Sequence, residues 1–222
     1  DLQIIKKNIS DLSFFNDYSQ SNKIDPSVLV DGLEHNKIIF INGKIEKIDF
    51  NFEDQNKIEI IDETKKDISF DYENSLIDLN NAFSNKTFKI VIKENYSLKK
   101  PLVIYHITNK KIKSKSINLR LDFELEKNSS LKLIDFFTDN SEKNFFNILY
   151  NFDLKKDSIL KNYKIDKFKN ENLRYSYNNI EQEINSVSET FILSAGSNYF
   201  KNEVNCNLKG KYSSAFINGI FS

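Results

Sequence analysis

A period of two in hydrophobicity runs through the chain from residue 88 onward. The segment Ile117-Asn-Leu-Arg-Leu-Asp-Phe-Glu-Leu125 alternates apolar and polar residues without a fault, and Phe146 to Leu154 repeats the pattern. Shorter apolar runs, Phe88 to Ile92 and Leu102 to Ile107, precede them. Such alternation is typical of strands with one buried face. Because no long helical pattern interrupts the chain after residue 88, we predict an all-β region there.

Strand–turn–strand units recur within this region. Strand-like runs end at Leu125, Leu154, Ile184 and Leu208, at intervals of 29, 30 and 24 residues. Each run is followed by a polar turn and a second strand; the turns are residues 126–130, 155–158, 185–186 and 209–213. A near-constant period indicates a solenoid, in which each turn buries its apolar face against its neighbours. A β-sandwich with regular hairpins has similar spacing, so the spacing alone leaves both folds open.

The first third of the chain has a mixed pattern. We expect two short helices, a hairpin with Asn42-Gly43 at its turn, a further strand and an amphipathic helix; these are Ile9–Tyr18, Pro26–His35, Lys37–Phe50, Lys57–Ile61 and Asn74–Asn85. The chain thus divides into a small mixed α/β N-terminal region, residues 1–86, and a β core, residues 87–222.

Composition excludes several classes of protein. The 32 basic and 32 acidic residues balance, which argues against a protein that binds nucleic acid by neutralising phosphates. Hydrophobic residues at 39% and aromatic residues at 13% argue against a disordered chain. No apolar run approaches the ~20 residues of a membrane helix. The single Cys excludes a disulfide framework and a metal site made of cysteines alone. We therefore expect a folded protein of the reducing cytoplasm, with neither nucleic acid nor membrane as a partner.

The two ends of the chain suggest a fragment. The start, Asp1-Leu2-Gln3, lacks the pattern of a signal peptide, and the sequence contains no Met. The chain stops at Ser222 inside an apolar run. We expect a piece of a longer protein, and this favours the solenoid, which can be cut between turns.

Five motifs occur in sequence over roughly residues 35 to 222: Ile38-Ile-Phe-Ile-Asn-Gly-Lys44, Leu79-Asn-Asn-Ala-Phe83, Lys100-Pro-Leu-Val-Ile-Tyr-His-Ile-Thr108, Ser194-Ala-Gly-Ser-Asn-Tyr-Phe-Lys-Asn-Glu-Val-Asn-Cys-Asn-Leu-Lys-Gly210 and Ser213-Ser-Ala-Phe-Ile-Asn-Gly219. In content and order they resemble the SufB/SufD family, the scaffold proteins of SUF iron–sulfur cluster assembly. The absence of SufB-type cysteine segments makes the chain more similar to SufD. Two departures are Lys201, where the family usually has Arg, and Ala195-Gly196, where it often has Gly-Gly.

The resemblance implies a fold and a role. The fold would be a right-handed parallel β-helix preceded by the small α/β region. The role would be a non-catalytic scaffold subunit that works with SufB-like and SufC-like subunits, SufC being an ATPase. No cofactor is expected in this chain, although the complete complex would handle an Fe–S cluster. The residues that act in cluster assembly would lie beyond Ser222.

Three side chains are candidate metal ligands. Cys206 shares a strand face with Phe200 and Val204, so we expect a buried hydrophobic role instead. His106 lies in an apolar strand, and because no partner recurs at ligand spacing, we expect a structural histidine. His35 is expected in a solvated loop. We therefore assign no catalytic, cofactor-binding or metal-binding residue.

Carboxylates leave one alternative function open. Because β-helices also occur in carbohydrate-active proteins, Asp153, Asp157 and Asp166 are a candidate acid cluster between turns. Most acidic residues, Asp122 among them, fall on outward strand positions. The glycines at 43, 196, 210 and 219 are isolated and form no phosphate loop. The basic segment of residues 109–115 is expected to be a solvated hairpin tip.

Overall fold

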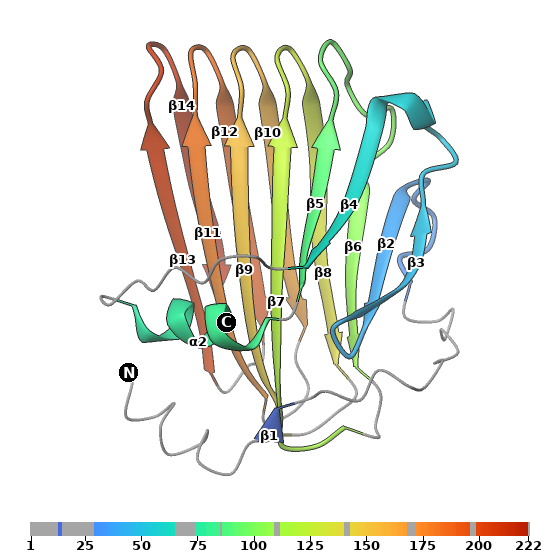
Figure 1. Cartoon of the computed structure of the whole chain (residues 1–222), viewed down its shortest axis with the longest axis vertical. Coiled ribbons are helices and arrows are strands. Elements are labelled where there is room, and N and C mark those ends of the chain that lie inside the picture. The colour runs from blue at the N-terminus through green and yellow to red at the C-terminus, as the bar shows by residue number, and fades with distance from the viewer. Residues whose placement is uncertain are drawn as a thin grey trace.

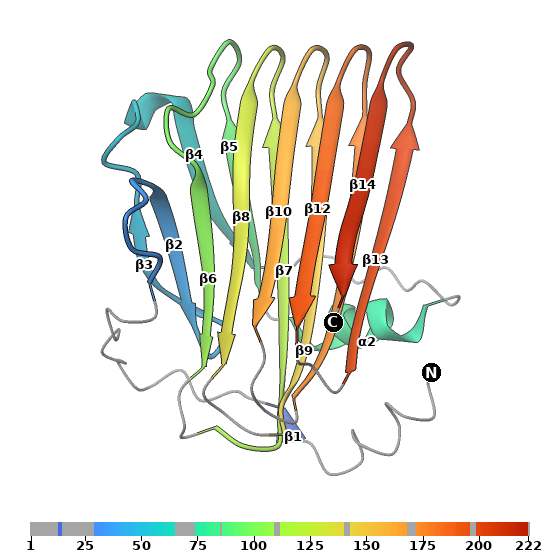
Figure 2. The same cartoon turned by 180° about the vertical axis from the view of Figure 1, so that it is seen from behind.

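Two parallel β-sheets face each other and form a flattened solenoid (Figures 1 and 2). The computed structural model describes residues 13–14, 29–64, 74–84, 86–108, 112–139, 143–167, 172–195 and 199–221. Sheet A has the order β13-β11-β9-β7-β5-β4, with β1 beside β7, and sheet B has the order β14-β12-β10-β8-β6-β2-β3. The elements are β1 Ser13–Phe14, β2 Asn36–Ile41, β3 Lys44–Asp49, the 3-10 turn η2 Gln55–Lys57, β4 Ile58–Thr64, α2 Ser75–Phe83, β5 Lys86–Ile92, β6 Leu102–Thr108, β7 Lys115–Leu125, β8 Ser130–Asp139, β9 Phe145–Leu154, β10 Ile159–Lys167, β11 Leu173–Gln182, β12 Val187–Ala195, β13 Tyr199–Leu208 and β14 Ser214–Phe221.

Each turn of the solenoid contributes one strand to each sheet, and inward side chains stack in register. In sheet A one inward row runs Phe123, Phe152, Ile180, Cys206 across β7, β9, β11 and β13. The rings of Phe123 and Phe152 stack with centroids 5.0 Å apart. The main apolar core lies between the two sheets and is formed by these rows. This pairing confirms the parallel solenoid, and the alternative β-sandwich is wrong.

The turns between paired strands repeat one backbone conformation. Asn128, Asp157 and Asn185 have φ of 57°, 60° and 58°, a left-handed conformation that Asn and Asp adopt more readily than most residues. The backbone N–H of each bonds to the carbonyl of the next turn, as in Asp157 to Ile184 at 3.0 Å. We predicted that the third strand ends at Ile184, but β11 ends at Gln182. Ile184 lies in the turn because it precedes this left-handed Asn.

The solenoid begins with two antiparallel strands. β3 pairs antiparallel with β2, and β4 pairs antiparallel with β5, so each sheet has a charged edge at this end. The predicted hairpin around Asn42-Gly43 and the strand at residues 57–61 are confirmed as β2–β3 and β4. Gly43 is required at the hairpin, because its φ is 84° and an added Cβ would lie 2.8 Å from Ile117 Cγ2.

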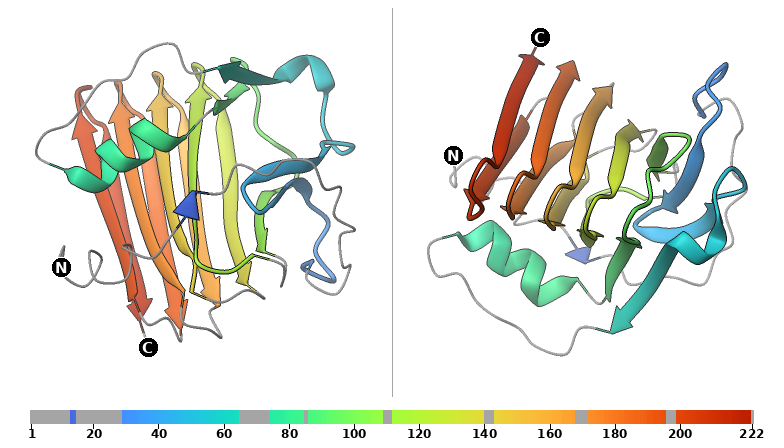
Figure 3. Two further views of the ribbon diagram at one scale, coloured as in Figure 1. Left: turned by 60° about the horizontal axis from the view of Figure 1, so that its bottom comes forward. Right: turned by 90° about the horizontal axis from the view of Figure 1, so that it is seen from above.

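Helix α2 lies across the outer face of sheet A (Figure 3). The Asn74 side chain caps its N-terminus by accepting from the backbone N–H groups of Leu76 and Ile77. Leu76 and Ile77 pack with outward residues of β9 and β11, including Phe145 and Tyr175. The predicted amphipathic helix of residues 74–85 is therefore confirmed as Ser75–Phe83.

The other two predicted helices are not supported where the structure describes them. Within Ile9–Tyr18, Ser13 and Phe14 form β1 and pair with Lys115 and Ser116 of β7; the rest lies outside the described residues. Within Pro26–His35, residues 29–35 contain no helix, and residues 26–28 are not described. The segment instead packs Leu29 and Val30 on the outer face of sheet B, where tertiary contacts replace local helix propensity.

Glu53 holds the segment after β3 against the solenoid. Its side chain accepts from Asn36 Nδ2 at 2.8 Å, Tyr96 Oη at 2.7 Å, and the backbone N–H groups of Lys99 and Lys100 at 3.1 and 3.0 Å. Burial alone would raise the pKa of Glu53, but these four donors stabilise the carboxylate and lower it. One buried carboxylate thus joins three segments of the chain.

Candidate functional site

A buried cluster of charged and aromatic side chains occupies the interior of the solenoid. Asp135 of β8 is fully buried and accepts four hydrogen bonds. Its Oδ1 lies 2.8 Å from His106 Nε2, and its Oδ2 lies 2.7 Å from Tyr150 Oη, 3.0 Å from Lys164 Nζ and 3.1 Å from an Arg174 terminal nitrogen. These residues come from five strands of both sheets, so the fold alone brings them together.

The register explains how the cluster forms. Lys164 of β10 pairs directly with Asp135 in sheet B, and both occupy inward positions of their strands. His106 is inward on β6, the next strand of the same sheet. Tyr150 and Arg174 face them from β9 and β11 of sheet A. The four donors therefore surround one carboxylate without any distortion of the strands.

Aromatic rings enclose the charges. The His106 ring stacks between Phe40 and Phe137, with centroids 5.5 and 5.8 Å away. Lys164 Nζ lies 3.5 Å from the centroid of the Tyr150 ring, and the Arg174 guanidinium lies 4.6 Å from that of Phe137. Cation–π contacts of this kind stabilise a charge that has been removed from water.

Burial and mutual attraction displace the pKa values of the cluster. Burial alone would raise the pKa of Asp135, but Lys164, His106 and Arg174 hold it well below its usual range. Burial lowers the pKa of Lys164 to about 8, against the opposing effect of Asp135. Burial also lowers the pKa of His106, which is therefore neutral near pH 7. Burial and Asp135 raise the pKa of Tyr150 well above its usual value.

The cluster carries no net charge. Arg174 also forms an ion pair with Asp166, which is buried and inward on β10. Two carboxylates thus balance Lys164 and Arg174, while His106 stays neutral. Balanced and hydrogen-bonded charges are tolerated in a protein interior, whereas an unpaired one is costly. Because the exposed fraction of Asp135, Lys164 and Arg174 is 1% or less, the described structure gives a reactant no access to them.

Sequence reasoning missed most of this cluster. It placed most acidic residues on outward positions, which holds for Asp122 but not for Asp135. For Asp135 the available signal was a charged residue in the apolar phase of its strand, which also contains Leu131, Leu133 and Phe137. Arg174, one of the two arginines of the chain, was a second signal, because arginine suits buried ion pairs.

The candidate ligands do not form a metal centre in the described part of the chain. His106 is buried, as expected of a structural residue, and its Nε2 is engaged by Asp135. Cys206 packs against the apolar core with Phe200 and Val204, and burial raises the pKa of its thiol. Among the described residues, no three His, Cys, Asp or Glu side chains are grouped as metal ligands would be.

His35 differs from the prediction, which placed it in solvent. Its side chain is buried, with Nδ1 2.6 Å from the Leu33 carbonyl and Nε2 2.8 Å from Tyr105 Oη. The Tyr105 hydroxyl also accepts from the backbone N–H of Val30 at 3.1 Å. His35 is buried because this network fastens the segment before β2 onto sheet B.

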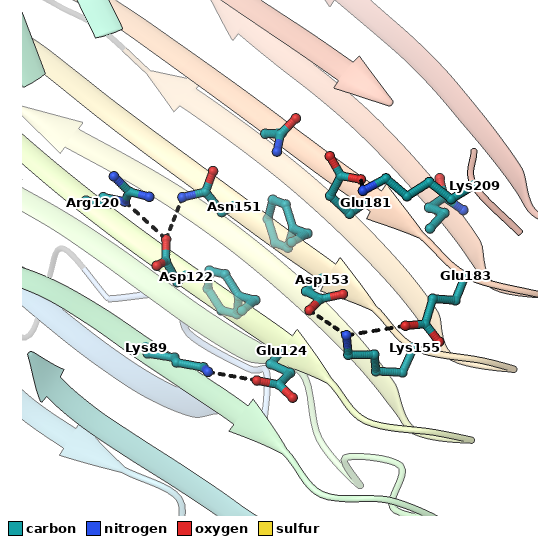
Figure 4. A pocket seen from close by; sticks show the side chains of 14 residues that line it. Lys89, Arg120, Asp122, Glu124, Asn151, Asp153, Lys155, Glu181, Glu183 and Lys209 are labelled. Carbon is teal, nitrogen blue, oxygen red and sulfur yellow. Dashed lines mark hydrogen bonds and ion pairs between the residues drawn. The ribbon is translucent and has the colours of Figure 1, made fainter. Parts of the chain in front are cut away.

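A charged groove of about 490 Å³ lies on the outer face of sheet A (Figure 4). Glu124, Asp153 and Glu181 occupy the same position on the neighbouring strands β7, β9 and β11. Each has a lysine partner: Lys89 at 2.8 Å from Glu124, Lys155 at 2.8 Å from Asp153 and Lys209 at 2.6 Å from Glu181. Partly exposed pairs of this kind contribute little stability.

The carboxylates proposed for carbohydrate chemistry lie in three different environments. Asp153 lies in this groove, Asp157 accepts from Asn185 in the turn row, and Asp166 lies in the solenoid interior. The candidate cluster of these three residues is therefore not formed. A pair of carboxylates facing one substrate, as hydrolysis of a glycoside requires, is not formed by these residues.

Comparison with known families identifies the solenoid. The model of the family described as "SUF system FeS cluster assembly, SufBD core domain" matches residues 105–222, more than half of the chain. The chain belongs to the SufBD core family. A comparison with curated proteins finds no match.

The SufBD match coincides with the solenoid. It begins within β6 and includes every strand from β7 to β14. The expected family and fold are confirmed, and they place the protein in iron–sulfur cluster assembly by the SUF system. Within the described residues, no helix is long and apolar enough to cross a bilayer.

Proposed function

We propose that this SufBD protein is a non-catalytic, SufD-like scaffold subunit of a cytoplasmic SUF complex, in which it supports assembly of an Fe–S cluster together with a SufB-like subunit and a SufC-like ATPase. The cluster is the cargo of the complex. The observation that carries the proposal is the family match over the solenoid, residues 105–222.

The interior chemistry supports a scaffold more than an enzyme. Asp135 and Lys164, whose pKa values are displaced, are buried and paired with each other, so they stabilise the fold. Cys206 is a lone, partly buried thiol with a raised pKa, which makes it a poor thiolate donor near pH 7. Recruitment of partner subunits is then the remaining role of the solenoid surfaces.

Co-expression tests the scaffold role. The chain, carrying an affinity tag, is produced with SufB-like and SufC-like subunits of the same genome and analysed by size-exclusion chromatography. We expect the three to elute together and the tagged chain alone to hydrolyse no ATP. If the other two subunits formed a complex that left this chain behind, the scaffold proposal would be wrong.

Reconstitution with iron and sulfide under anaerobic conditions tests the expected lack of a resident cluster. We expect no stable visible charge-transfer absorption from the chain alone, since it has one Cys and two His on separate elements. A cluster that formed on the chain and survived Cys206→Ala would reveal a ligand set among other residues.

We also propose that residues 1–86 and 87–222 are two parts of one folding unit. β2 pairs with β6 and β4 pairs with β5, so the N-terminal part continues both sheets of the core. Limited proteolysis that released a stable core of residues 87–222 would instead indicate independent domains.

A further inference from the structure

The outer face of sheet B carries an apolar band, whereas that of sheet A carries the charged groove. Two neighbouring rows of outward side chains form the band across β8, β10, β12 and β14. They are Ile134, Tyr163 and Phe191 in one row, which ends at the polar Asn218 of β14, and Phe136, Ile165, Leu193 and Ile220 in the other. In Figure 2 these strands face the viewer, and no other described helix or strand lies in front of them.

Much of the band is open to solvent. The exposed fractions of Tyr163, Leu193 and Ile220 are 37%, 38% and 56%. A contiguous apolar surface on a folded protein commonly marks an interaction site.

The band continues an interface that the chain itself uses. On β6 the adjoining outward residues Val103 and Tyr105 are fully buried, because Leu29 and Val30 pack on them. Ile134 and Phe136 at the near end of the band join the same apolar contact. From β10 onward the described segments leave this face uncovered.

The dimensions of the band fit one helix. Three strand spacings of ~4.8 Å give a length of about 14 Å, and two rows lie ~7 Å apart along the strands. At 1.5 Å per residue, a helix of about ten residues matches that length. A second copy of the sheet would bury roughly a few hundred Å² here, well below the ~800 Å² per partner of a stable interface.

Helix α2 shows the same packing on sheet A. Its nine residues lie across the strands, with Leu76 and Ile77 against Phe145 and Tyr175 of β9 and β11 (Figure 3). The outer faces of this solenoid thus accommodate a short helix that crosses the strands.

Charge at one border indicates the chemistry of the occupant. The row between the band and the turns contains Lys132, Lys161 and Glu189 on β8, β10 and β12, with Lys161 3.1 Å from Glu189, and ends at the exposed Phe216 of β14. Two cations against one anion favour acidic side chains on the facing border of a helix.

We propose that the apolar band of sheet B is the docking site for one amphipathic α-helix of a partner protein. This helix is about ten residues long, lies across β8, β10, β12 and β14, and has acidic residues on its border toward Lys132 and Lys161. It places apolar side chains on Tyr163, Phe191 and Leu193. The proposed scaffold role names no surface, so this inference goes beyond it.

A designed peptide tests the docking site on the apolar band. The probe is a fluorescent 14-residue peptide with Leu at positions i, i+3, i+4 and i+7 of a helix and Glu elsewhere. Anisotropy is measured with the full chain and with the double variant Tyr163→Lys/Leu193→Lys. Asn179→Lys, on the outer face of sheet A, is the matched control. We expect saturable binding that the double variant weakens at least tenfold and the control leaves unchanged.

Charge and helix dependence complete the test. Lys132→Glu/Lys161→Glu should weaken binding severalfold, and a peptide with two central prolines should not bind, because it cannot form the helix. Equal binding to the proline peptide, no effect of the band variants, or a chain dimer abolished by Tyr163→Lys/Leu193→Lys would each overturn the proposal. Co-elution with SUF subunits is a separate measurement, so failure of the proposed scaffold role is distinguishable from failure of the proposed docking site.

Discussion

Removing the charge of Asp135 tests whether the interior cluster stabilises the solenoid as its geometry indicates. In Asp135→Asn the shape is nearly unchanged, but Lys164 and Arg174 lose the anion that both contact at about 3 Å. Breaking a buried charge pair by neutralising one partner costs about 3–5 kcal/mol. Because single domains are stable by about 5–15 kcal/mol, this is a large fraction of the free energy of unfolding.

The assay is equilibrium unfolding in urea, followed by circular dichroism. We expect the midpoint of Asp135→Asn to fall with an unchanged slope, which reports a change in stability instead of compactness. Asp153→Asn is the matched control, because Asp153 is half-exposed and pairs with Lys155; we expect a loss below about 1 kcal/mol.

A second substitution separates lost charge balance from lost packing. In Asp135→Asn/Lys164→Met one uncompensated cation is removed, while Arg174 keeps its ion pair with Asp166. We expect the double variant to be more stable than Asp135→Asn alone, by about 1–2 kcal/mol of coupling. A loss below 1 kcal/mol for Asp135→Asn, or strictly additive effects, would refute the proposed balance of charges.

Three further outcomes follow from other parts of the structure. The pKa of Lys164 is about 8 in the folded chain, below its ordinary value of 10.5, so the unfolded chain binds more protons between these two values. The free energy of unfolding, relative to Lys164→Met, should therefore rise by up to about 1.4 kcal/mol per pH unit from pH 8 upward. A difference between the two urea melts that did not change with pH would contradict the burial of a charged Lys164. Glu53→Ala should lower the free energy of unfolding by about 2–3 kcal/mol at pH 7, whereas the exposed Glu59→Ala should have little effect. Because the pKa of Glu53 is lowered from 4.5, its stabilisation should be present above pH 4.5 and disappear as the pH falls through the folded pKa. Equal losses of stability at pH 7 and at pH 2–3 would contradict this. The chain should self-associate through the apolar edge strand β14, and Ile217→Lys should reduce the associated mass measured by light scattering. A wild-type chain that stayed monomeric at high concentration would count against an open edge.

The alternating pattern predicted the fold well because it depends on local chemistry. The runs at residues 88–92, 117–125 and 146–154 each have one apolar phase, and the structure places that phase between the sheets. The Asn-Gly hairpin and the amphipathic helix at residues 74–85 were equally local, since turn residues and helical apolar spacing act within a few positions. Residues 29–35 failed as a helix because their conformation depends on distant contacts with β6.

The phase of a strand does not predict what its inward side chains contact. Ser176, Ser188 and Thr190 occupy inward positions of β11 and β12 and are buried, although their composition resembles an exposed face. A polar interior is stable when hydrogen bonds are formed, as between Ser188 Oγ and Gln182 Oε1 at 2.8 Å. Hydrophobicity alone therefore could not show where the interior changes from apolar to polar.

The turn residues contain enough information to have located the centre of the cluster. Ser129 and Ser158 occupy equivalent turn positions, each donating its backbone N–H to the carbonyl three residues earlier. Counting six residues from each serine reaches Asp135 and Lys164, and in parallel in-register strands equal counts mean adjacent positions. An anion and a cation in the same inward row of neighbouring strands would then predict a buried ion pair. Arg174 needs a further step, because its contact with Asp135 crosses from sheet A to sheet B and depends on how the sheets face each other, which no count along the chain provides.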